Sequence, residues 1–81
     1  MKVRVLFFSV LQDATGCAEC EWDCDGAETV GDLVTMLYAR WPGLEKWDGS
    51  LLLALDQTYV KRDAALHDDA EVALMPPVQG G

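Results

Sequence analysis

The chain has 81 residues, of which 51% are apolar, and its 14 acidic against 6 basic side chains give a formal net charge of −8. This length fits one domain around a single hydrophobic core. The acidic excess would repel a nucleic-acid backbone and an anionic membrane surface, so neither is an expected partner. No apolar run approaches the ~20 residues of a spanning helix, and the start of the chain lacks a signal-peptide cleavage pattern, so we expect a cytoplasmic protein.

The first part of the chain has the pattern of a β-hairpin. Lys2 to Val10 is rich in Val and Phe, which predicts a strand. The polar segment Gln12 to Gly16 predicts a turn or a single helical turn. Glu19 to Cys24 alternates strictly between polar and apolar residues and predicts the second strand.

Three cysteines, Cys17, Cys20 and Cys24, have the spacing C-x2-C-x3-C, which suggests a metal site. In a strand, however, Cys20 and Cys24 would lie about 13 Å apart at ~3.3 Å per residue. One zinc ion with Zn–S bonds near ~2.3 Å cannot span that distance. We therefore expect no metal site, and we interpret Cys20, Trp22 and Cys24 as one inward strand face with buried, inert thiols.

A helix is predicted to begin after Thr29, which with Asp32 resembles a capping box. Pro42-Gly43 is expected to end it. The apolar residues between follow the i, i+3, i+4, i+7 rule and form a stripe that is expected to pack on a sheet as core: Val30, Leu33, Val34, Leu37, Tyr38 and Trp41.

The second half predicts three more strands. After a loop or short turn at Glu45–Ser50 they are Leu51–Leu55, Tyr59–Lys61 behind a tight connection at Gln57-Thr58, and Glu71–Met75 behind a turn at His67–Asp69. The order ββαβββ predicts an α+β fold of the ubiquitin-like β-grasp type, with a mixed sheet and one main helix on one face. Residues 1–81 are expected to form this single domain, with 76–81 as an extended, flexible C-terminal tail. His67 has no second ligand within motif spacing and is interpreted as a solvated loop residue.

The tail Pro76-Pro77-Val78-Gln79-Gly80-Gly81 predicts delivery of a carboxylate into another protein. At an average Gly usage of ~7%, two terminal glycines arise by chance in roughly 0.5% of chains. Paired prolines favour an extended exit, and glycines without Cβ suit a channel too narrow for side chains. Because a carboxylate is a poor sulfur source until it is activated, a partner must supply ATP and a thiol. Gly81 is therefore the candidate reacting residue.

These residues resemble a known family. The start Lys2–Phe8, the segments Leu52–Val60 and Asp69–Ala73, and above all the tail Pro76–Gly81 are similar to the small subunit of molybdopterin synthase, a ubiquitin-like sulfur carrier. The resemblance implies that an activating enzyme uses ATP to adenylate Gly81 and that sulfur then replaces an oxygen to give a thiocarboxylate. It also implies that the tail enters the large subunit, where it donates sulfur to cyclic pyranopterin monophosphate to form molybdopterin.

The resemblance further implies sulfurtransferase activity only in complex with the large subunit, in a heterotetramer, with no permanently bound cofactor. Two positions depart from the family pattern: Asp56, where Asn is common, and Met75, where an aromatic residue is common. Two other classes end in the same glycine pair. One is the carrier for the thiamine thiazole, which is typically shorter and lacks Pro-Pro-Val. The other is a ubiquitin-like modifier, whose terminus becomes an amide on a target lysine.

The open face of the predicted sheet is a candidate docking surface for a partner. Phe8 falls in register with Lys2 and Arg4, on the face away from the predicted helix. Met75 is expected on the same face, and Tyr59 joins them because its neighbour Val60 points the other way. An apolar patch that leads into the tail is typical of a protein interface.

Overall fold

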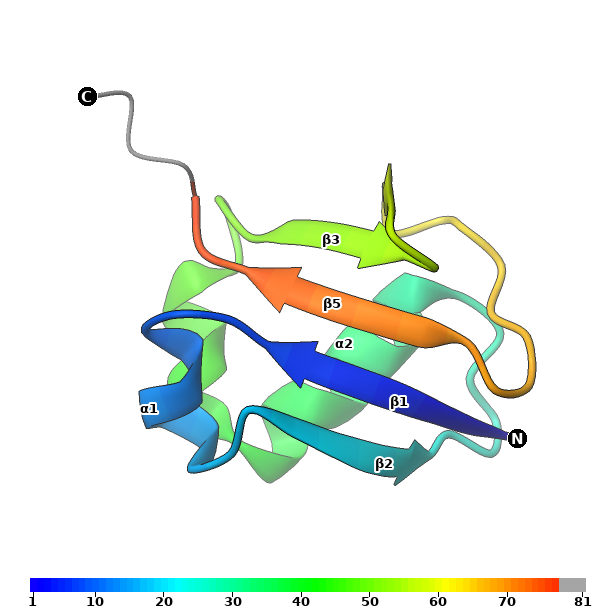
Figure 1. The fold of residues 1–81 in the computed structure, drawn as a ribbon, viewed down its shortest axis with the longest axis horizontal. Coiled ribbons are helices and arrows are strands. Elements are labelled where there is room, and N and C mark those ends of the chain that lie inside the picture. The colour runs from blue at the N-terminus through cyan, green and yellow to red at the C-terminus, as the bar shows by residue number, and fades with distance from the viewer. Residues whose placement is uncertain (78–81) are drawn as a thin grey trace.

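The computed structural model describes residues 1–77. The elements along the chain are β1 (Lys2–Phe7), α1 (Leu11–Thr15), β2 (Glu19–Asp23), α2 (Val30–Arg40), the 3-10 helix η1 (Pro42–Trp47), β3 (Leu52–Leu55), β4 (Thr58–Val60) and β5 (Glu71–Met75). The strands form one sheet in the order β2-β1-β5-β3-β4, in which β1 and β5 are parallel and the other neighbours antiparallel. Helix α2 crosses behind this sheet in Figure 1, so the predicted mixed sheet with one main helix on one face is confirmed.

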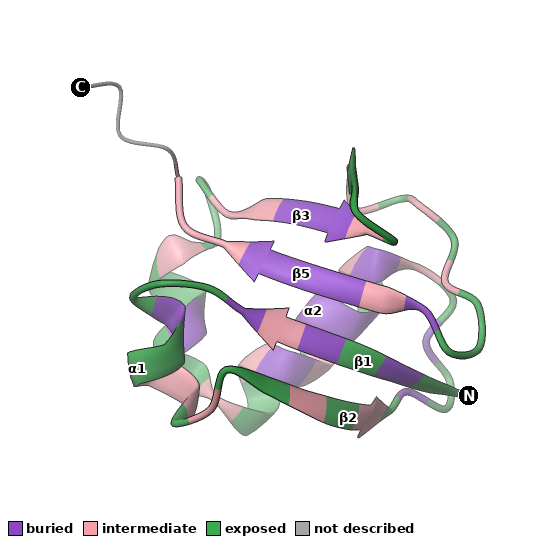
Figure 2. Cartoon of the chain, in the orientation of Figure 1, coloured by how far each residue is buried: buried purple, intermediate pink, exposed green. Residues whose placement is uncertain are grey.

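The core lies between the sheet and α2. The helix buries Val30, Leu33, Val34 and Leu37, as its 3.6-residue period predicts, while Tyr38 and Trp41 at the end of the stripe are only partly buried. The strands supply the opposite side through alternate residues: Val3, Val5, Phe7, Leu53, Val72 and Leu74. Figure 2 shows the resulting alternation along β1, where buried and exposed residues succeed one another.

The first turn of α2 is closed by the predicted capping box. The backbone N–H of Asp32 donates to Thr29 Oγ1 over 3.1 Å, and that of Thr29 donates to Asp32 Oδ2 over 3.1 Å. The N–H of Glu28 also donates to Asp32 Oδ2, over 3.0 Å. Hydrogen bonds from the Glu28 and Thr29 backbone therefore lower the pKa of Asp32. This cap explains why the helix begins at the residue that the sequence indicates.

The first strand is shorter than predicted, because it ends at Phe7 instead of Val10. Ser9 adopts a left-handed conformation with φ 55°, which turns the chain out of the sheet. Helix α1 follows and fully buries Leu11. The predicted single helical turn before Gly16 is confirmed, and Gly16 ends it at φ 78°.

Two connections in the second half also differ from prediction. The segment from Pro42 to Trp47 forms the 3-10 helix η1 with Leu44 fully buried, whereas a loop or short turn at Glu45–Ser50 was expected. The turn between β3 and β4 consists of Asp56 and Gln57, with φ 50° and 70°, and not of Gln57-Thr58. Two successive positive φ values are typical of a two-residue hairpin whose twist matches that of its strands.

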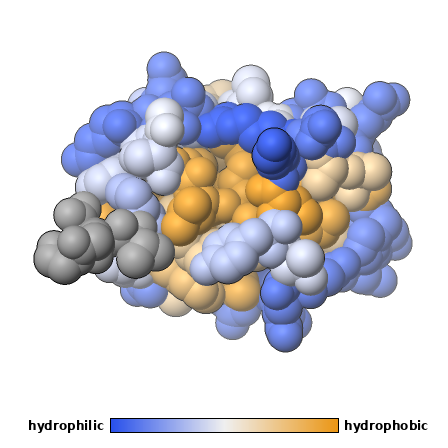
Figure 3. Space-filling view, turned by 90° about the horizontal axis from the view of Figure 1, so that it is seen from above, coloured by the Kyte–Doolittle hydropathy of each residue, from blue (hydrophilic) through white to orange (hydrophobic). Residues whose placement is uncertain are grey.

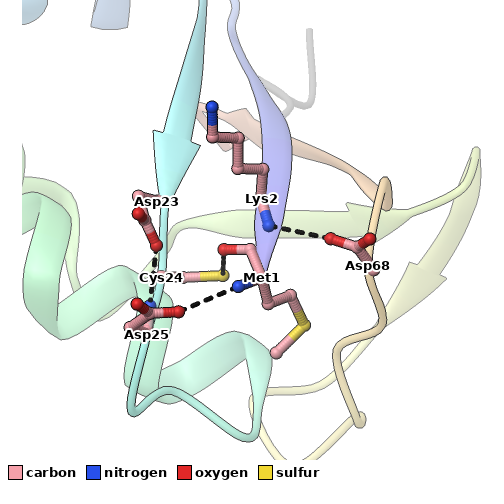
Figure 4. A network of polar contacts seen from close by, with 6 residues as sticks. All are labelled: Met1, Lys2, Asp23, Cys24, Asp25 and Asp68. Atoms are coloured by element: carbon pink, nitrogen blue, oxygen red, sulfur yellow. Dashed lines mark hydrogen bonds and ion pairs between the residues drawn. The ribbon is translucent and has the colours of Figure 1, made fainter.

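The start of β1 is joined by hydrogen bonds and an ion pair to the loops on both sides of it (Figure 4). The Met1 ammonium group lies 2.8 Å from Asp25 Oδ1, and this contact raises the pKa of the ammonium group. The Met1 carbonyl accepts from the Cys24 N–H over 2.9 Å and from Cys24 Sγ over 3.4 Å. The Lys2 N–H donates to Asp68 Oδ1 over 2.9 Å. These bonds join segments from both halves of the chain.

We expect Gly31→Ala to destabilise the fold by about 1 kcal/mol, because overpacking a close contact costs about 1–3 kcal/mol while the better helix propensity of Ala returns at most ~1 kcal/mol. A Cβ at Gly31 would lie 3.1 Å from both Cβ and the carbonyl oxygen of Arg62. That oxygen already accepts from the Gly31 N–H over 2.8 Å. Urea unfolding of this variant beside Gly49→Ala, where a Cβ meets nothing within 4 Å, measures the effect. Equal midpoints for the two variants would contradict the close approach.

Candidate functional site

The face of the sheet away from α2 carries a row of side chains that crosses four strands. Leu6 on β1 pairs with Ala73 on β5, Ala73 pairs with Ala54 on β3, and Ala54 pairs with Tyr59 on β4. The two alanines are small and lie between the larger Leu6 and Tyr59, so they form a low floor between two walls. Both alanines are 8% exposed.

A shallow hollow of ≈ 210 Å³ lies over this row. Its lining is mainly apolar and consists of Leu6, Phe8, Ala54, Gln57, Tyr59, Glu71, Ala73 and Met75. Phe8 and Tyr59 expose 44% and 70% of their surface and line the same hollow, so they form an exposed apolar patch, which is more informative than single exposed residues. Figure 3, seen from above and therefore at right angles to the view of this face in Figure 1, shows apolar surface bordered by hydrophilic residues. An exposed apolar hollow with a polar border is typical of a protein interface.

The structure brings the three predicted interface residues together around this hollow. Phe8 lies one residue beyond the end of β1 at Phe7, so the predicted strand is too long, but Phe8 lines the hollow together with Leu6 and is therefore on the predicted face. Its backbone N–H donates to the Leu74 carbonyl over 3.1 Å, which places it beside β5. The role of Phe8, Tyr59 and Met75 in docking stays a prediction.

Sequence reasoning missed other residues of the same face. Leu6 could have been found, because it alternates with Arg4 on the outward side of β1. Leu52 lies opposite Met75 in the register of β3 and β5. Ala54 and Ala73 carry no local signal, because only the pairing of three strands shows that they share one floor.

The hollow leads toward the tail along β5. Glu71 lines it at the start of this strand and Met75 at its end. The half-buried Pro76 and Pro77 come next, at the upper left in Figure 1. Val78, Gln79, Gly80 and Gly81, the remaining predicted tail residues, lie outside the described residues. A partner seated on the hollow would therefore contact the segment from which the tail begins.

The other half of the open face is charged. Lys2 and Arg4 on β1 are flanked by Glu21 on β2 and by Glu71 on β5, and these residues line a second hollow with Val3 and Asp69. Arg4 Nε lies 3.8 Å from Glu19 Oε2, with both side chains about 60% exposed, so this pair is weak. The face thus has an apolar half next to the tail and a charged half next to the N-terminus.

The cysteines lie away from the apolar hollow, on or beside β2. Cys24 is buried as expected, whereas Cys17 and Cys20 are only half-buried, so the expectation of three buried thiols is wrong for these two. Cys20 and Trp22 do pack inward against the core. Burial raises the pKa of the Cys20 and Cys24 thiols, which disfavours the reactive thiolate. Within residues 1–77 no group of three or more His, Cys, Asp or Glu side chains could hold a metal ion.

We expect replacement of Cys17, Cys20 and Cys24 by Ala to leave sulfur transfer from a chemically prepared thiocarboxylate unchanged per folded molecule. The raised pKa of two of these thiols and their position on the other side of the sheet give them no part in the transfer. The cost should be one of stability, on the order of 1 kcal/mol for each small core change. Loss of transfer in a folded triple variant would indicate a cysteine mechanism.

His67 has a partner that the sequence did not suggest. Its side chain is exposed, as expected, but Nε2 lies 2.5 Å from Asp56 Oδ2 in the β3–β4 turn. This contact is the largest cause of the raised pKa of His67. The pKa of Asp56 is lowered mainly by the hydrogen bond from the Glu71 backbone N–H and further by the contact with His67. Because the two residues are 11 positions apart in the sequence, no motif spacing could have indicated the pair.

The sheet order and the single crossing helix define a ubiquitin-like β-grasp protein. Solved structures share this fold over the whole chain. SAMP1 from Haloferax volcanii is 28% identical with a TM-score of 0.85, covering 100% of both chains. A chain from the Helicobacter pylori complex of subunits 1 and 2 of molybdopterin-converting factor is 27% identical with a TM-score of 0.73, again covering 100% of both chains.

Sequence comparison is more specific: residues 5–81 match the ThiS family, and the chain belongs to this family. The molybdopterin synthase sulfur carrier subunit of Chlamydomonas reinhardtii is 36% identical over 84 residues, which cover 100% of both chains. The subunit of the same name from Escherichia coli is 37% identical and covers 98% of this chain and 99% of its own. In residues 1–77 we find no helix with the length and apolar character needed to cross a bilayer.

Proposed function

We propose that this chain is the sulfur-carrier subunit of molybdopterin synthase. The observation that carries the proposal is the full-length similarity to two subunits of that name, at 36% and 37% identity. The apolar hollow on the open sheet face supports it, because a carrier must dock on the proteins that act on its terminus. The chain then contributes to sulfurtransferase activity only as part of a complex.

The chemistry takes place at the Gly81 carboxylate. A carboxylate oxygen attacks the α-phosphorus of ATP on an activating enzyme, which forms an acyl adenylate and releases pyrophosphate. Sulfur at the oxidation level of sulfide, supplied by a donor, then attacks the acyl carbon and displaces AMP, so that one carboxylate oxygen is replaced by one sulfur. The resulting thiocarboxylate is the sulfur donor for the dithiolene of molybdopterin, and water restores the carboxylate after transfer. ATP is bound by the activating enzyme, so this chain needs no resident cofactor.

The large subunit docks on the apolar half of the open face. Phe8, Tyr59 and Met75 provide the exposed apolar area, and the alanine floor provides a recess for a partner side chain. Because Met75 directly precedes Pro76, a partner bound here receives the tail from the end of β5. The end of β5 therefore belongs to the docking surface and also leads directly into the tail that delivers Gly81.

The proposal is tested by the intact mass of the chain from cells that contain the activating enzyme. The expected result is a species heavier by the exchange of one oxygen for one sulfur, located by fragmentation at Gly81. Cells that lack the activating enzyme are the control and should give only the carboxylate form. An unmodified mass in both cell types, with the enzyme present and active, would contradict the proposal.

A second candidate function is that of a protein modifier, which the similarity to the structure of SAMP1, small archaeal modifier protein 1 of Haloferax volcanii, favours. A modifier would also be activated at Gly81, but its acyl group would pass to a lysine amine and form an isopeptide bond. Covalent conjugates that resist reducing agents would identify this function. Their absence from cells that accumulate the thiocarboxylate would leave the carrier function alone.

A further inference from the structure

The wall of the docking hollow that contains Tyr59 and Gln57 is weakly supported by the sheet. Strand β4 has three residues and lies at the edge of the sheet, and within residues 1–77 its one neighbouring strand is β3. Tyr59 is 70% exposed, so core packing does little to fix its position. Other contacts must therefore hold the hairpin tip in place.

Those contacts meet at Asp56. Its backbone N–H donates to the Glu71 carbonyl over 2.8 Å, and its Oδ1 accepts from the Glu71 N–H over 3.0 Å. Its second carboxylate oxygen, Oδ2, faces His67 Nε2 at 2.5 Å. One side chain thus joins the hairpin turn to the start of β5 and to the loop before it.

The protonation state of His67 follows from its two neighbours. Nε2 faces the Asp56 carboxylate, and Nδ1 faces the Asp68 carbonyl at 2.9 Å, so both ring nitrogens lie next to oxygen acceptors. A neutral imidazole has only one N–H, whereas the imidazolium ion donates from both nitrogens. The charged groups that act on the ring are also acidic, namely Asp56 from the hairpin turn and Asp69 from its own loop. The geometry therefore selects the protonated ring.

We propose that His67 is a positioning residue for the docking hollow: its imidazolium form latches Asp56 against the start of β5 and so holds Tyr59 and Gln57 in the hollow wall. This inference rests on the proposed docking of the large subunit. When the ring loses a proton, one of its two nitrogens becomes an acceptor, and this nitrogen then faces an oxygen that is also an acceptor. The turn between β3 and β4 then loses one of the contacts that hold it in place, and binding of the partner weakens.

The direction of the pH dependence follows from the contacts. The pKa of His67 is raised above 6.5, and the largest cause is the hydrogen bond that the His67 ring donates to the Asp56 carboxylate. The latch is fully present below the pKa of an unperturbed histidine and is lost as the pH rises through the raised value. The chain has one histidine. The pKa values of the Met1 ammonium group and of the Cys20 and Cys24 thiols are also raised, from ordinary values that lie above that of histidine.

The test measures Kd for the large subunit by calorimetry at about pH 6 and about pH 8.5, for the natural chain and for His67→Gln. The pH dependence of the partner itself cancels in the ratio of the two Kd values at each pH. We expect His67→Gln to bind at least about threefold more weakly than the natural chain at the lower pH and equally at the higher pH. Asp69→Asn, which removes a nearby acid but not the latch, is the matched control and should keep the pH dependence.

A ratio that does not change with pH would overturn the inference, while failure of the natural chain to bind at any pH would contradict the proposed function instead. A second measurement needs no partner. The amide shifts of Gln57 and Tyr59 should titrate together with the His67 ring in NMR spectra of the isolated chain, and this titration should vanish in His67→Gln. Shifts that do not follow the ring would also overturn the latch.

Discussion

Removal of Gly81 is expected to reduce sulfur transfer by at least about 10²-fold while the fold stays intact. The deletion leaves a carboxylate on Gly80 that is chemically similar but one residue, or ~3.3 Å, short of the partner's reacting groups. A misplacement of even ~1 Å can cost about 10²-fold in rate. The measurement is molybdopterin formation with purified partners, together with ATP-dependent adenylate formation on the activating enzyme.

Two further variants separate the effect of the length of the tail from the effect of side-chain size inside the partner's channel. One residue added after Gly81 should also abolish transfer, because the tail is then too long and the new carboxylate lies beyond the partner's reacting groups. Gly80→Ala keeps the length but adds a Cβ, so it should slow transfer according to the width of the channel. Circular dichroism establishes that each variant is folded. Near-normal transfer by the deletion or by the extension would show that the terminus is not the carrier.

Phe8→Asp and Met75→Asp should each weaken binding to the large subunit by on the order of 10²-fold. Each substitution removes an apolar contact and places a charge where docking would exclude water, and interface anchors of this kind contribute more than about 2 kcal/mol. The fold should tolerate both changes, since Phe8 is 44% exposed and Met75 lies on the open side of β5. Calorimetric titration of the large subunit gives the affinities.

Two controls make this docking prediction specific to the hollow. Thr35→Asp adds the same charge on an exposed position of α2, which packs on the opposite side of the sheet, and should leave the affinity unchanged. Ala73→Phe fills the floor of the hollow without adding charge and should weaken binding as the aspartate variants do. Wild-type affinity for both Phe8→Asp and Met75→Asp would remove this face from the interface.

The elements that the sequence predicted well are those specified by neighbouring residues. Helix α2 begins at Val30, because the capping box and the 3.6-residue stripe both lie within one short segment. Strand β5 has the predicted bounds, Glu71–Met75, and packs Val72 and Leu74 inward as its alternation indicates. The nature of the tail and its candidate residue Gly81 also come from local sequence, and their role stays a prediction.

The candidate docking site depended on contacts between distant segments. Phe8 left the strand predicted for it, because burial of Leu11 in α1 required the chain to turn at Ser9. Ala54 and Ala73 became one floor only through the antiparallel register of β3 and β5. A periodic pattern determines which face of its own element a residue occupies. Which residues of other elements lie beside it depends on strand order and register, which follow from packing the whole core.

The same distinction applies to His67. The sequence by itself correctly indicated an exposed residue in an acidic turn, since the surrounding aspartates and the absence of an apolar pattern are local features. Only the tertiary structure placed its ring between the Asp56 carboxylate and the Asp68 carbonyl. The reason is that hydrogen bonds of this kind form after the β3–β4 hairpin and β5 are paired, and that pairing brings together residues whose distance in sequence carries no periodic signal.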